Sequence, residues 1–215
     1  MKKLLVYSNL GLGDHIACCG MVRHWAKFCN VTLLCKPHNR VSVAALYWDI
    51  PITIVEVEND NVAKVFVDSW DDNKRLIGCA NQLWNNGGDI PFDVTFYAHA
   101  GLPHKFRWSK FKYEQNDNPV PSTPYIFLHE DASRGFIIDR SYCKLDIIEP
   151  DKTTYPRITD WCNLISCATE VHVINSSFLL LVDQIETIGK LFWHKYARDE
   201  GKVCNPTVKK NWVIL

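Results

Sequence analysis

Short apolar runs alternate with longer segments of helical periodicity in the first part of the chain. Lys3–Ser8 is such a run, and Asp14–Phe28 follows it with apolar residues at helical spacing. Val31–Cys35 and Ile52–Val57 predict two more strands, with a short helix over Val41–Tyr47 between them. Strands that alternate with helices predict a parallel sheet with right-handed crossovers.

The middle of the chain has a less regular pattern. Val62–Trp70 fits a helix or a strand, and Arg75–Ala80 predicts a buried strand before the polar, turn-rich stretch Asn81–Asp89. Gly101–Asn118 interleaves basic and aromatic residues, as an amphipathic helix with a solvated basic face does. The alternatives for this stretch are a loop that binds an acceptor or a polyanion, and a surface that binds single-stranded nucleic acid.

The stretch Asn116–Pro124 is the best candidate for a linker, because its Pro, Asn and Ser residues oppose both helix and strand. After it the alternation restarts. The predicted strands are Tyr125–His129, Leu145–Ile148, Glu170–Ile174 and Lys190–His194, and the predicted helices are Ile158–Ala168 and Phe178–Ile188. The pattern therefore predicts an α/β protein with an N-terminal lobe over residues 1–118 and a C-terminal lobe over residues 119–215.

Composition narrows the class of protein. Lys+Arg and Asp+Glu both number 24, so the formal net charge is zero and nucleic acid is not expected as a partner. The odd count of nine cysteines, without a secretory signal, predicts reduced thiols and a cytoplasmic location, and the lack of a Cys-x-x-Cys pair predicts no metal site. The apolar run after the two N-terminal lysines is too short for a signal peptide or a membrane span.

The first candidate site is the turn between the first predicted strand and helix. Gly11 and Gly13 let the backbone approach a ligand, and the helix N-terminus offers N–H groups to a phosphate. Asp14, or His15 beside it, could take a proton from an attacking hydroxyl. A dinucleotide site is disfavoured because Ile16 stands where its fingerprint needs a third glycine. The alternative is a plain tight turn with Asp14 as the N-cap.

The second candidate site follows the predicted strand Tyr125–His129 and begins at His129 itself. Arg134 can bind a phosphate in a bidentate manner, and the Ser133 hydroxyl and the Gly135 amide add neutral donors. The alternative is a surface loop in which Arg134 pairs with a carboxylate of the same loop.

The third candidate site follows the predicted strand Glu170–Ile174. Asn175, Ser176 and Ser177 precede a predicted helix, whose N-terminus can bind an anion. The structural alternative is a helix cap, because small polar residues are good N-caps. Ligands of open parallel sheets bind at the carboxyl ends of the strands, so we expect all three sites to face ligand.

These motifs resemble those of GT-B-type glycosyltransferases. The stretch Ser8–His15 resembles the opening of bacterial heptosyltransferases, in which a serine precedes a Gly-Asp pair and a helix. The catalytic base of that family corresponds to Asp14, whereas Met21 and Val22 stand in the region where the family has a proline. The stretch Asn175–Phe178 resembles the late Asn-Ser-Ser/Thr-Phe motif of fucosyltransferase-like enzymes, which lies near the sugar nucleotide.

The stretch His129–Arg134 is similar to the earlier His-x-Arg-Arg motif of the same enzymes, with Glu130 and Asp131 in place of basic residues. The resemblance implies two Rossmann-like lobes with parallel sheets around a central cleft, a compact GT-B-like fold. It also implies inverting, metal-independent transfer of a sugar from a nucleotide-sugar donor to a hydroxyl of a glycan or other acceptor, with no cofactor. The alternative function is non-catalytic binding of a nucleotide or nucleotide sugar, and the oligomeric state stays open.

Overall fold

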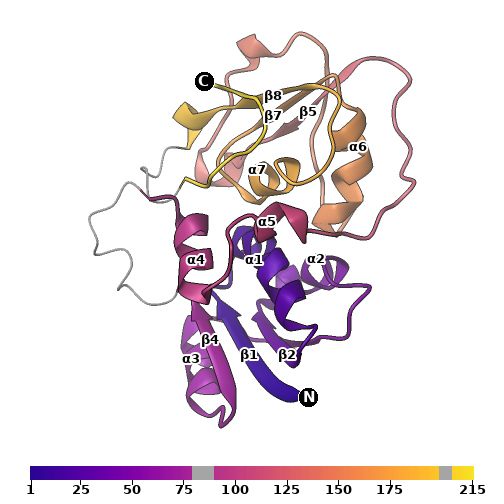
Figure 1. Cartoon of the computed structure of the whole chain (residues 1–215). Coiled ribbons are helices and arrows are strands. Elements are labelled where there is room, and N and C mark those ends of the chain that lie inside the picture. The colour runs from indigo at the N-terminus through magenta and orange to yellow at the C-terminus, as the bar shows by residue number, and fades with distance from the viewer. Residues whose placement is uncertain (79–89, 199–204) are drawn as a thin grey trace. The chain divides into compact units, whose positions relative to one another are not determined.

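The computed structural model describes residues 1–78, 90–198 and 205–215 (Figure 1). The chain forms two compact units. The first unit comprises Met1–Glu114 with Lys202–Thr207, and the second comprises Gln115–Gly201 with Val208–Leu215. Each unit contains its own parallel sheet.

The first unit is built on a four-stranded parallel sheet (Figure 1). Its strands are β1 (Lys2–Ser8), β2 (Cys29–Cys35), β3 (Thr53–Glu56) and β4 (Asn73–Ile77). They lie in the order β3-β2-β1-β4, and every pairing is parallel. β1 is central and its last five residues are buried, as an apolar strand covered on both faces requires. β4 lies at the edge of the sheet.

Helices cover both faces of this sheet. They are α1 (Leu12–Trp25), α2 (Arg40–Ala45), α3 (Asp60–Asp68), α4 (Phe92–Ala100) and α5 (Phe106–Ser109), with a 3₁₀ turn over Pro37–Asn39. The β1–α1–β2 crossover runs toward β3, whereas the β3–α3–β4 crossover runs back across β1. Right-handed crossovers therefore place α1 and α3 on opposite faces. The Tyr97 hydroxyl of α4 donates to the Ala17 carbonyl of α1 at 3.1 Å.

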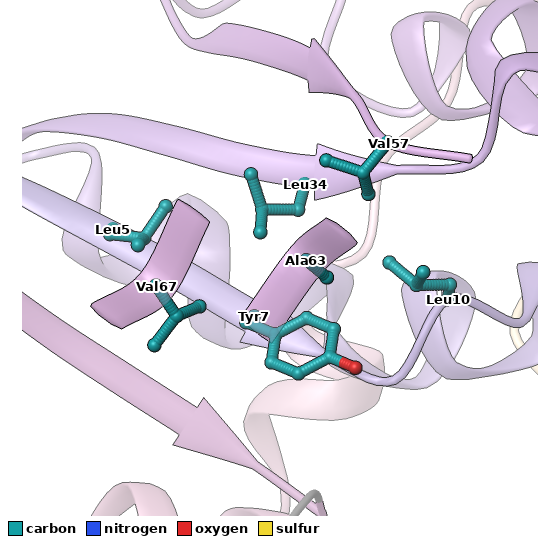
Figure 2. Packing of buried hydrophobic residues seen from close by; sticks show 7 residues of the cluster. All are labelled: Leu5, Tyr7, Leu10, Leu34, Val57, Ala63 and Val67. Atoms are coloured by element: carbon teal, nitrogen blue, oxygen red, sulfur yellow. The ribbon is translucent and has the colours of Figure 1, made fainter. Parts of the chain in front are cut away.

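A hydrophobic cluster packs α3 against one face of the first sheet (Figure 2). Its buried members are Leu5, Tyr7, Leu10, Leu34, Val57, Ala63 and Val67. Full burial of each large apolar side chain stabilises the fold by about 1.5–3 kcal/mol. Side chains alternate along a strand, so Ser8, the neighbour of Tyr7, points to the opposite face, which α1 covers.

The second unit is built on a five-stranded parallel sheet. Its strands are β5 (Tyr125–His129), β6 (Asp146–Ile148), β7 (Glu170–Val173), β8 (Lys190–Trp193) and β9 (Trp212–Ile214). They lie in the order β6-β5-β7-β8-β9, and every pairing is parallel.

The two faces of the second sheet are covered differently. The helical segments are α6 (Cys162–Cys167), α7 (Ser177–Val182) and 3₁₀ turns over Ala132–Arg134, Arg140–Tyr142, Ile158–Trp161 and Lys195–Ala197. On one face Phe127 of β5 packs against Trp161 and Phe178, with ring centroids 6.2 and 5.5 Å apart. On the other face Ile138 packs against Ile126 and neighbours. Residues 130–145 thus cover a sheet face with a loop of short 3₁₀ turns.

The predicted α/β fold class with parallel sheets is confirmed. Seven predicted strands correspond to β1, β2, β3, β5, β6, β7 and β8. The ambiguous stretch Val62–Trp70 belongs to helix α3, whose N-cap Asn59 accepts hydrogen bonds from the N–H groups of Asn61 and Val62. The predicted helix Phe178–Ile188 is shorter in the structure, because α7 ends at Val182.

Other sequence predictions are wrong. Only α5 is helical within Gly101–Asn118, and Arg107, expected on a solvated basic face, is fully buried. Its Nη1 donates to the buried Asp93 carboxylate at 2.5 Å and to the Thr207 carbonyl at 2.6 Å. A buried carboxylate needs such a partner, so the segment folds around this ion pair instead of extending as a helix.

One further strand prediction needs correction. The stretch Arg75–Ala80 was expected to be buried, but β4 is exposed apart from Ile77, because it lies at the edge of the sheet. The predicted turn-rich stretch Asn81–Asp89 lies outside the described residues. Helix α4 and strand β9 were not predicted.

Candidate functional site

Each sheet has one point at which the strand order reverses. β1 has β2 and β3 on one side and β4 on the other, and β5 has β6 on one side and β7 on the other. Loops that follow the two strands at such a switch point leave toward opposite faces, and ligands of open α/β sheets bind there. The residues that follow β1 and β4, and those that follow β5 and β7, are therefore the candidate sites.

In the first unit, β1 leads into α1 through a turn with an unusual backbone. Asn9 has a φ of 31°, close to the left-handed region that few residues other than glycine adopt and that asparagine tolerates. Leu10 is buried, and its carbonyl accepts a hydrogen bond from Asn39 Nδ2 at 3.0 Å. Gly11 is the N-cap of α1. These contacts define the path of the chain into the helix.

The Asp14 carboxyl folds back over this turn. A Cβ on Gly11 would lie 2.6 Å from Oδ2 of Asp14, so a larger residue there would displace the carboxyl. Asp14 lies in the first turn of α1, and the N-cap of this helix is Gly11. The alternative interpretation, in which Asp14 is the N-cap, is therefore wrong. The carboxyl lies over Gly11 instead.

Burial raises the pKa of Asp14 to about 7, against hydrogen bonds from the Asn9 side chain and the Gly11 N–H that lower it. The charge of Asp60, at the start of α3, raises this pKa further. Asp60 accepts a hydrogen bond from the Tyr7 hydroxyl at 2.7 Å. Asp14 is only half-buried, so solvent reaches it. Such a carboxyl can accept and release a proton at neutral pH.

His15, the other candidate base, is fully buried, and burial lowers its pKa to about 4. Neither of its ring nitrogens has a hydrogen-bond partner among the described residues, and the same holds for the hydroxyl of the buried Ser8. His15 is thus neutral and shielded. Of the two neighbours, Asp14 is the one that a substrate hydroxyl can reach.

In the second unit the structure brings two predicted motifs together at the switch point. His129 Nδ1, at the end of β5, lies 3.1 Å from Oγ of Ser176, which follows β7. Ser176 is the N-cap of α7 and accepts a hydrogen bond from the Phe178 N–H, while its hydroxyl is also hydrogen-bonded to the His129 ring. Burial lowers the pKa of His129 to about 4, which keeps the imidazole neutral. Asn175, the residue before Ser176, is buried, and Ser177 is the first residue of α7.

Ser133 and Arg134 lie in a tight loop after β5. Ser133 Oγ donates to Asp131 Oδ1 at 2.7 Å, and Arg134 Nε donates to Asp131 Oδ2 at 2.6 Å. Gly135 turns the chain with a φ of 79°. Arg134 therefore pairs with a carboxylate of its own loop, as the surface-loop alternative predicted. The Arg134 side chain remains 56% exposed, with its guanidinium over the Phe136 ring.

A chain of hydrogen-bonded side chains lies under the loop that covers the other face of the second sheet. The Tyr196 hydroxyl accepts from the Asp139 N–H at 2.9 Å and so donates to His194 Nδ1 at 3.2 Å. His194 Nε2 then donates to His172 Nδ1 at 2.8 Å, and His172 Nε2 donates to Glu170 at 3.2 Å. Burial lowers the pKa of both histidines, that of His194 to about 4, so both are neutral.

Sequence reasoning missed three residues at the first switch point. Asn9 and Asp60 act on the Asp14 carboxyl. Gly78, which follows β4, has a φ of 70°, and a Cβ there would lie 2.3 Å from the Phe96 ring and 3.2 Å from Asn9 Nδ2. The tolerance of asparagine for positive φ, directly before a glycine turn, was the available signal for Asn9. No comparable signal marked Asp60.

Thiols, metal sites and membrane spans add little to the site. The seven cysteines in the described part of the chain are free, and burial raises the pKa of the Cys19 thiol, in the middle of α1. Among the described residues, no three His, Cys, Asp or Glu side chains lie together as a metal site needs. Within those same residues, no helix has both the length and the apolar character to cross a membrane.

These observations define an α/β protein with two parallel, Rossmann-like sheets. Its fold is similar to the crystal structure of a glycosyl transferase family 9 protein from Veillonella parvula DSM 2008, with a TM-score of 0.61. The similarity covers 100% of this chain and 86% of that one at 7% sequence identity, so it shows the fold alone. No model of a known protein family matches the sequence, and no curated protein matches it.

Proposed function

We propose that this protein is a glycosyltransferase that moves a sugar from a nucleotide-sugar donor to an acceptor hydroxyl, with inversion and without a metal ion. The observation that carries the proposal is the half-buried Asp14 carboxyl at the carboxyl end of β1, folded over Gly11 and with a pKa of about 7. The fold similarity to a glycosyl transferase family 9 protein supports the same class of reaction.

Asp14 is the general base of the proposed reaction. Its ionised carboxyl accepts the proton of the acceptor hydroxyl while the hydroxyl oxygen bonds to the anomeric carbon. The bond from that carbon to the donor diphosphate breaks, and the electron pair leaves on the diphosphate. A pKa of about 7 suits this step, because a base with a pKa near the operating pH is both ionised and basic. Such a base contributes about 10²–10⁴ to the rate.

The second unit supplies the proposed contacts to the leaving diphosphate. The exposed guanidinium of Arg134 can pair with it, and the hydroxyl of Ser133 and the backbone of Ser177 can donate to it. Ser176 is held by His129, so its position is set before a ligand binds. Preorganised donors of this kind cost no reorganisation when charge develops on the leaving group.

The test of this proposal is turnover. The full-length protein is incubated under reducing conditions, as its proposed cytoplasmic location requires, with a panel of nucleoside diphosphate sugars and hydroxyl acceptors. We expect acceptor-dependent release of nucleoside diphosphate that continues in EDTA, and a product whose anomeric configuration is inverted by NMR. A product with retained configuration, or release that stops in EDTA, contradicts the proposed mechanism.

A non-catalytic nucleotide-binding protein is the second candidate, because the contacts around His129, Ser176 and Arg134 need no base to bind a diphosphate. Thermal unfolding against the same nucleotide panel separates the two functions. Binding without turnover across a broad set of acceptors favours the binding protein.

A further inference from the structure

Residues 130–145 cover one face of the second sheet, and a pair of buried histidines lies on that face. His172 of β7 pairs in register with Leu128 of β5, and residues at paired positions of neighbouring strands share a face of the sheet. Leu128 belongs to the hydrophobic cluster that includes Ile138 of the loop. His172 and His194 are 1% and 0% exposed, so both imidazoles are closed off from solvent.

The hydrogen bonds of this pair run in one direction. As a carboxylate, Glu170 only accepts, so the His172 Nε2–H donates to it at 3.2 Å. Neutral His172 then accepts at Nδ1 from the His194 Nε2–H, 2.8 Å away. Neutral His194 accepts at Nδ1 from the Tyr196 hydroxyl at 3.2 Å, and the oxygen of that hydroxyl accepts from the Asp139 N–H at 2.9 Å. The chain of donors therefore begins on the loop and ends on the sheet.

We propose that this chain is a proton-sensitive latch, which holds residues 130–145 on the sheet while both histidines are neutral and releases them when the histidines are protonated. The Asp139 N–H links the histidine pair to the loop. The same loop carries Ser133 and Arg134, so its release would withdraw the proposed anion contacts. That effect on ligand binding rests on the proposed function, whereas the latch itself does not.

The closed chain has no place for added protons. A first proton on His194 Nδ1 turns that atom into a donor, so the Tyr196 oxygen faces two N–H donors and its own proton loses its acceptor. A second proton on His172 Nδ1 sets the N–H groups of two imidazolium cations against each other, with their nitrogens 2.8 Å apart. Buried cations of this kind regain water only when the loop leaves the sheet. Release of the loop should therefore take up two protons.

The groups around the pair keep it neutral in the closed state. Burial lowers the pKa of both histidines, that of His194 to about 4, against the carboxylates Glu170 on β7 and Asp139 on the loop, which raise it. The Tyr142 ring of the loop lies 5.5 Å from the ring of His194. An opened loop returns each imidazole to an ordinary pKa of about 6.5, so the closed state is favoured above pH 6.5 and weakens as the pH falls toward 4.

The latch is tested by amide hydrogen exchange of the full chain at pH 7 and pH 5, corrected for the intrinsic pH dependence of exchange. Peptides from residues 130–145 report on the loop, and peptides from β7 report on global unfolding. His172→Gln removes one titrating group, and Tyr196→Phe removes the link to the loop. Tyr142→Phe, which keeps the ring that lies against His194, is the matched control.

We expect the loop to exchange well ahead of β7 at pH 5, with an opening constant about 10²–10³-fold above that at pH 7. In His172→Gln the rise should shrink to about 20-fold, because one proton is taken up instead of two. Tyr196→Phe should raise the opening constant several-fold already at pH 7, and Tyr142→Phe should change neither value. A loop that exchanges only together with β7, or a rise that His172→Gln leaves unchanged, overturns the latch.

Added nucleotides separate the latch from the proposed function. UDP, ADP, GDP and CDP are each added to the exchange reaction at pH 5. A diphosphate bound by Ser133 and Arg134 should hold the loop closed and slow its exchange, because a ligand stabilises the state that binds it. A loop that opens with acid as expected but is slowed by none of the four keeps the latch and contradicts the proposed anion contacts instead.

Discussion

The two units place different chemistry at the same topological point. In the first unit the strand ends at the switch point carry a carboxyl, Asp14, whose pKa burial raises to about 7. In the second they carry an imidazole, His129, whose pKa burial lowers to about 4, hydrogen-bonded to Ser176. Both shifts have the same leading cause, loss of solvent, which disfavours whichever form is charged.

The difference shows how similar sheets can support opposite tasks. The raised pKa makes Asp14 a base that is half ionised near pH 7, suited to proton transfer. The lowered pKa of His129 keeps its ring neutral and hydrogen-bonded to a hydroxyl, with the cation Arg134 exposed in the loop after β5. In the proposed function, proton transfer accordingly belongs to the first unit and anion binding to the second.

The largest effect should come from Asp14→Asn. The amide cannot accept the acceptor proton, so kcat is expected to fall by about 10²–10⁴ with little change in the KM of the donor. Steady-state kinetics measure both values. Asp68→Asn, at the exposed end of α3, is the matched control and should leave kcat unchanged. Near-normal turnover by Asp14→Asn would show that Asp14 is not the general base.

Sequence patterns predicted both sheets because strand periodicity and the turns after strands are local signals. The rule that parallel strands share a carboxyl edge also predicted that His129 and Ser176 face one site, and the structure places them 3.1 Å apart. Arg107 was misjudged because its partners are remote in sequence: Asp93 lies 14 residues away and Thr207 lies 100 residues away. No local pattern reports such an ion pair.

The position of the first unit's acid was only partly predictable. Asp14 was identified from the glycine turn, but the approach of Gly78, which arrives from β4 and lies against Phe96 and Asn9, was not. These contacts join residues that are far apart in the sequence, so no local pattern predicts them. The end of α4 carried an unused signal, since Gly101, with a φ of 66°, is the left-handed residue that commonly ends a helix.

Acid should weaken the second unit more than the first. For His129 and His194, with pKa values of about 4 folded and 6.5 unfolded, the unfolded chain binds more protons, so stability is lost as the pH falls from 6.5 toward 4. Each should cost roughly 2 kcal/mol at pH 5. In the first unit, His15 also lowers the stability of the fold as the pH falls. Asp14, whose pKa is raised, has the opposite effect and increases the stability of this unit as the pH falls from 7 toward 3.8. These two contributions nearly cancel.

Urea unfolding at pH 7 and pH 5, followed by NMR signals assigned to each unit, measures this difference. Asp14→Asn sharpens the comparison, because it removes the compensating acid and should make the first unit acid-sensitive as well. His38→Gln, at an exposed position, is the control and should change neither unit. Equal loss of stability in both units of the unchanged protein contradicts the assignment.

A smaller effect on binding is expected from Arg134→Ala. Loss of a charge-assisted contact should raise the Kd of a nucleoside diphosphate about tenfold, with kcat at saturating donor nearly unchanged. The expected effect is modest because Arg134 already shares its charge with Asp131. Isothermal titration calorimetry measures the change, and Lys152→Ala, exposed in the same unit, is the control. A lower kcat with an unchanged Kd would show that Arg134 does not contribute to binding of the nucleoside diphosphate.

The last prediction compares one glycine from each unit. Gly78 and Gly135 have positive φ values of 70° and 79°, so alanine costs about 1–2 kcal/mol at either position. A Cβ at Gly78 would also meet the Phe96 ring at 2.3 Å, whereas nothing lies within 4 Å of one at Gly135. Gly78→Ala should therefore lower the free energy of unfolding by about 1–3 kcal/mol more than Gly135→Ala. Equal losses in chemical denaturation would mean that the Phe96 ring moves away from the added methyl group at little cost.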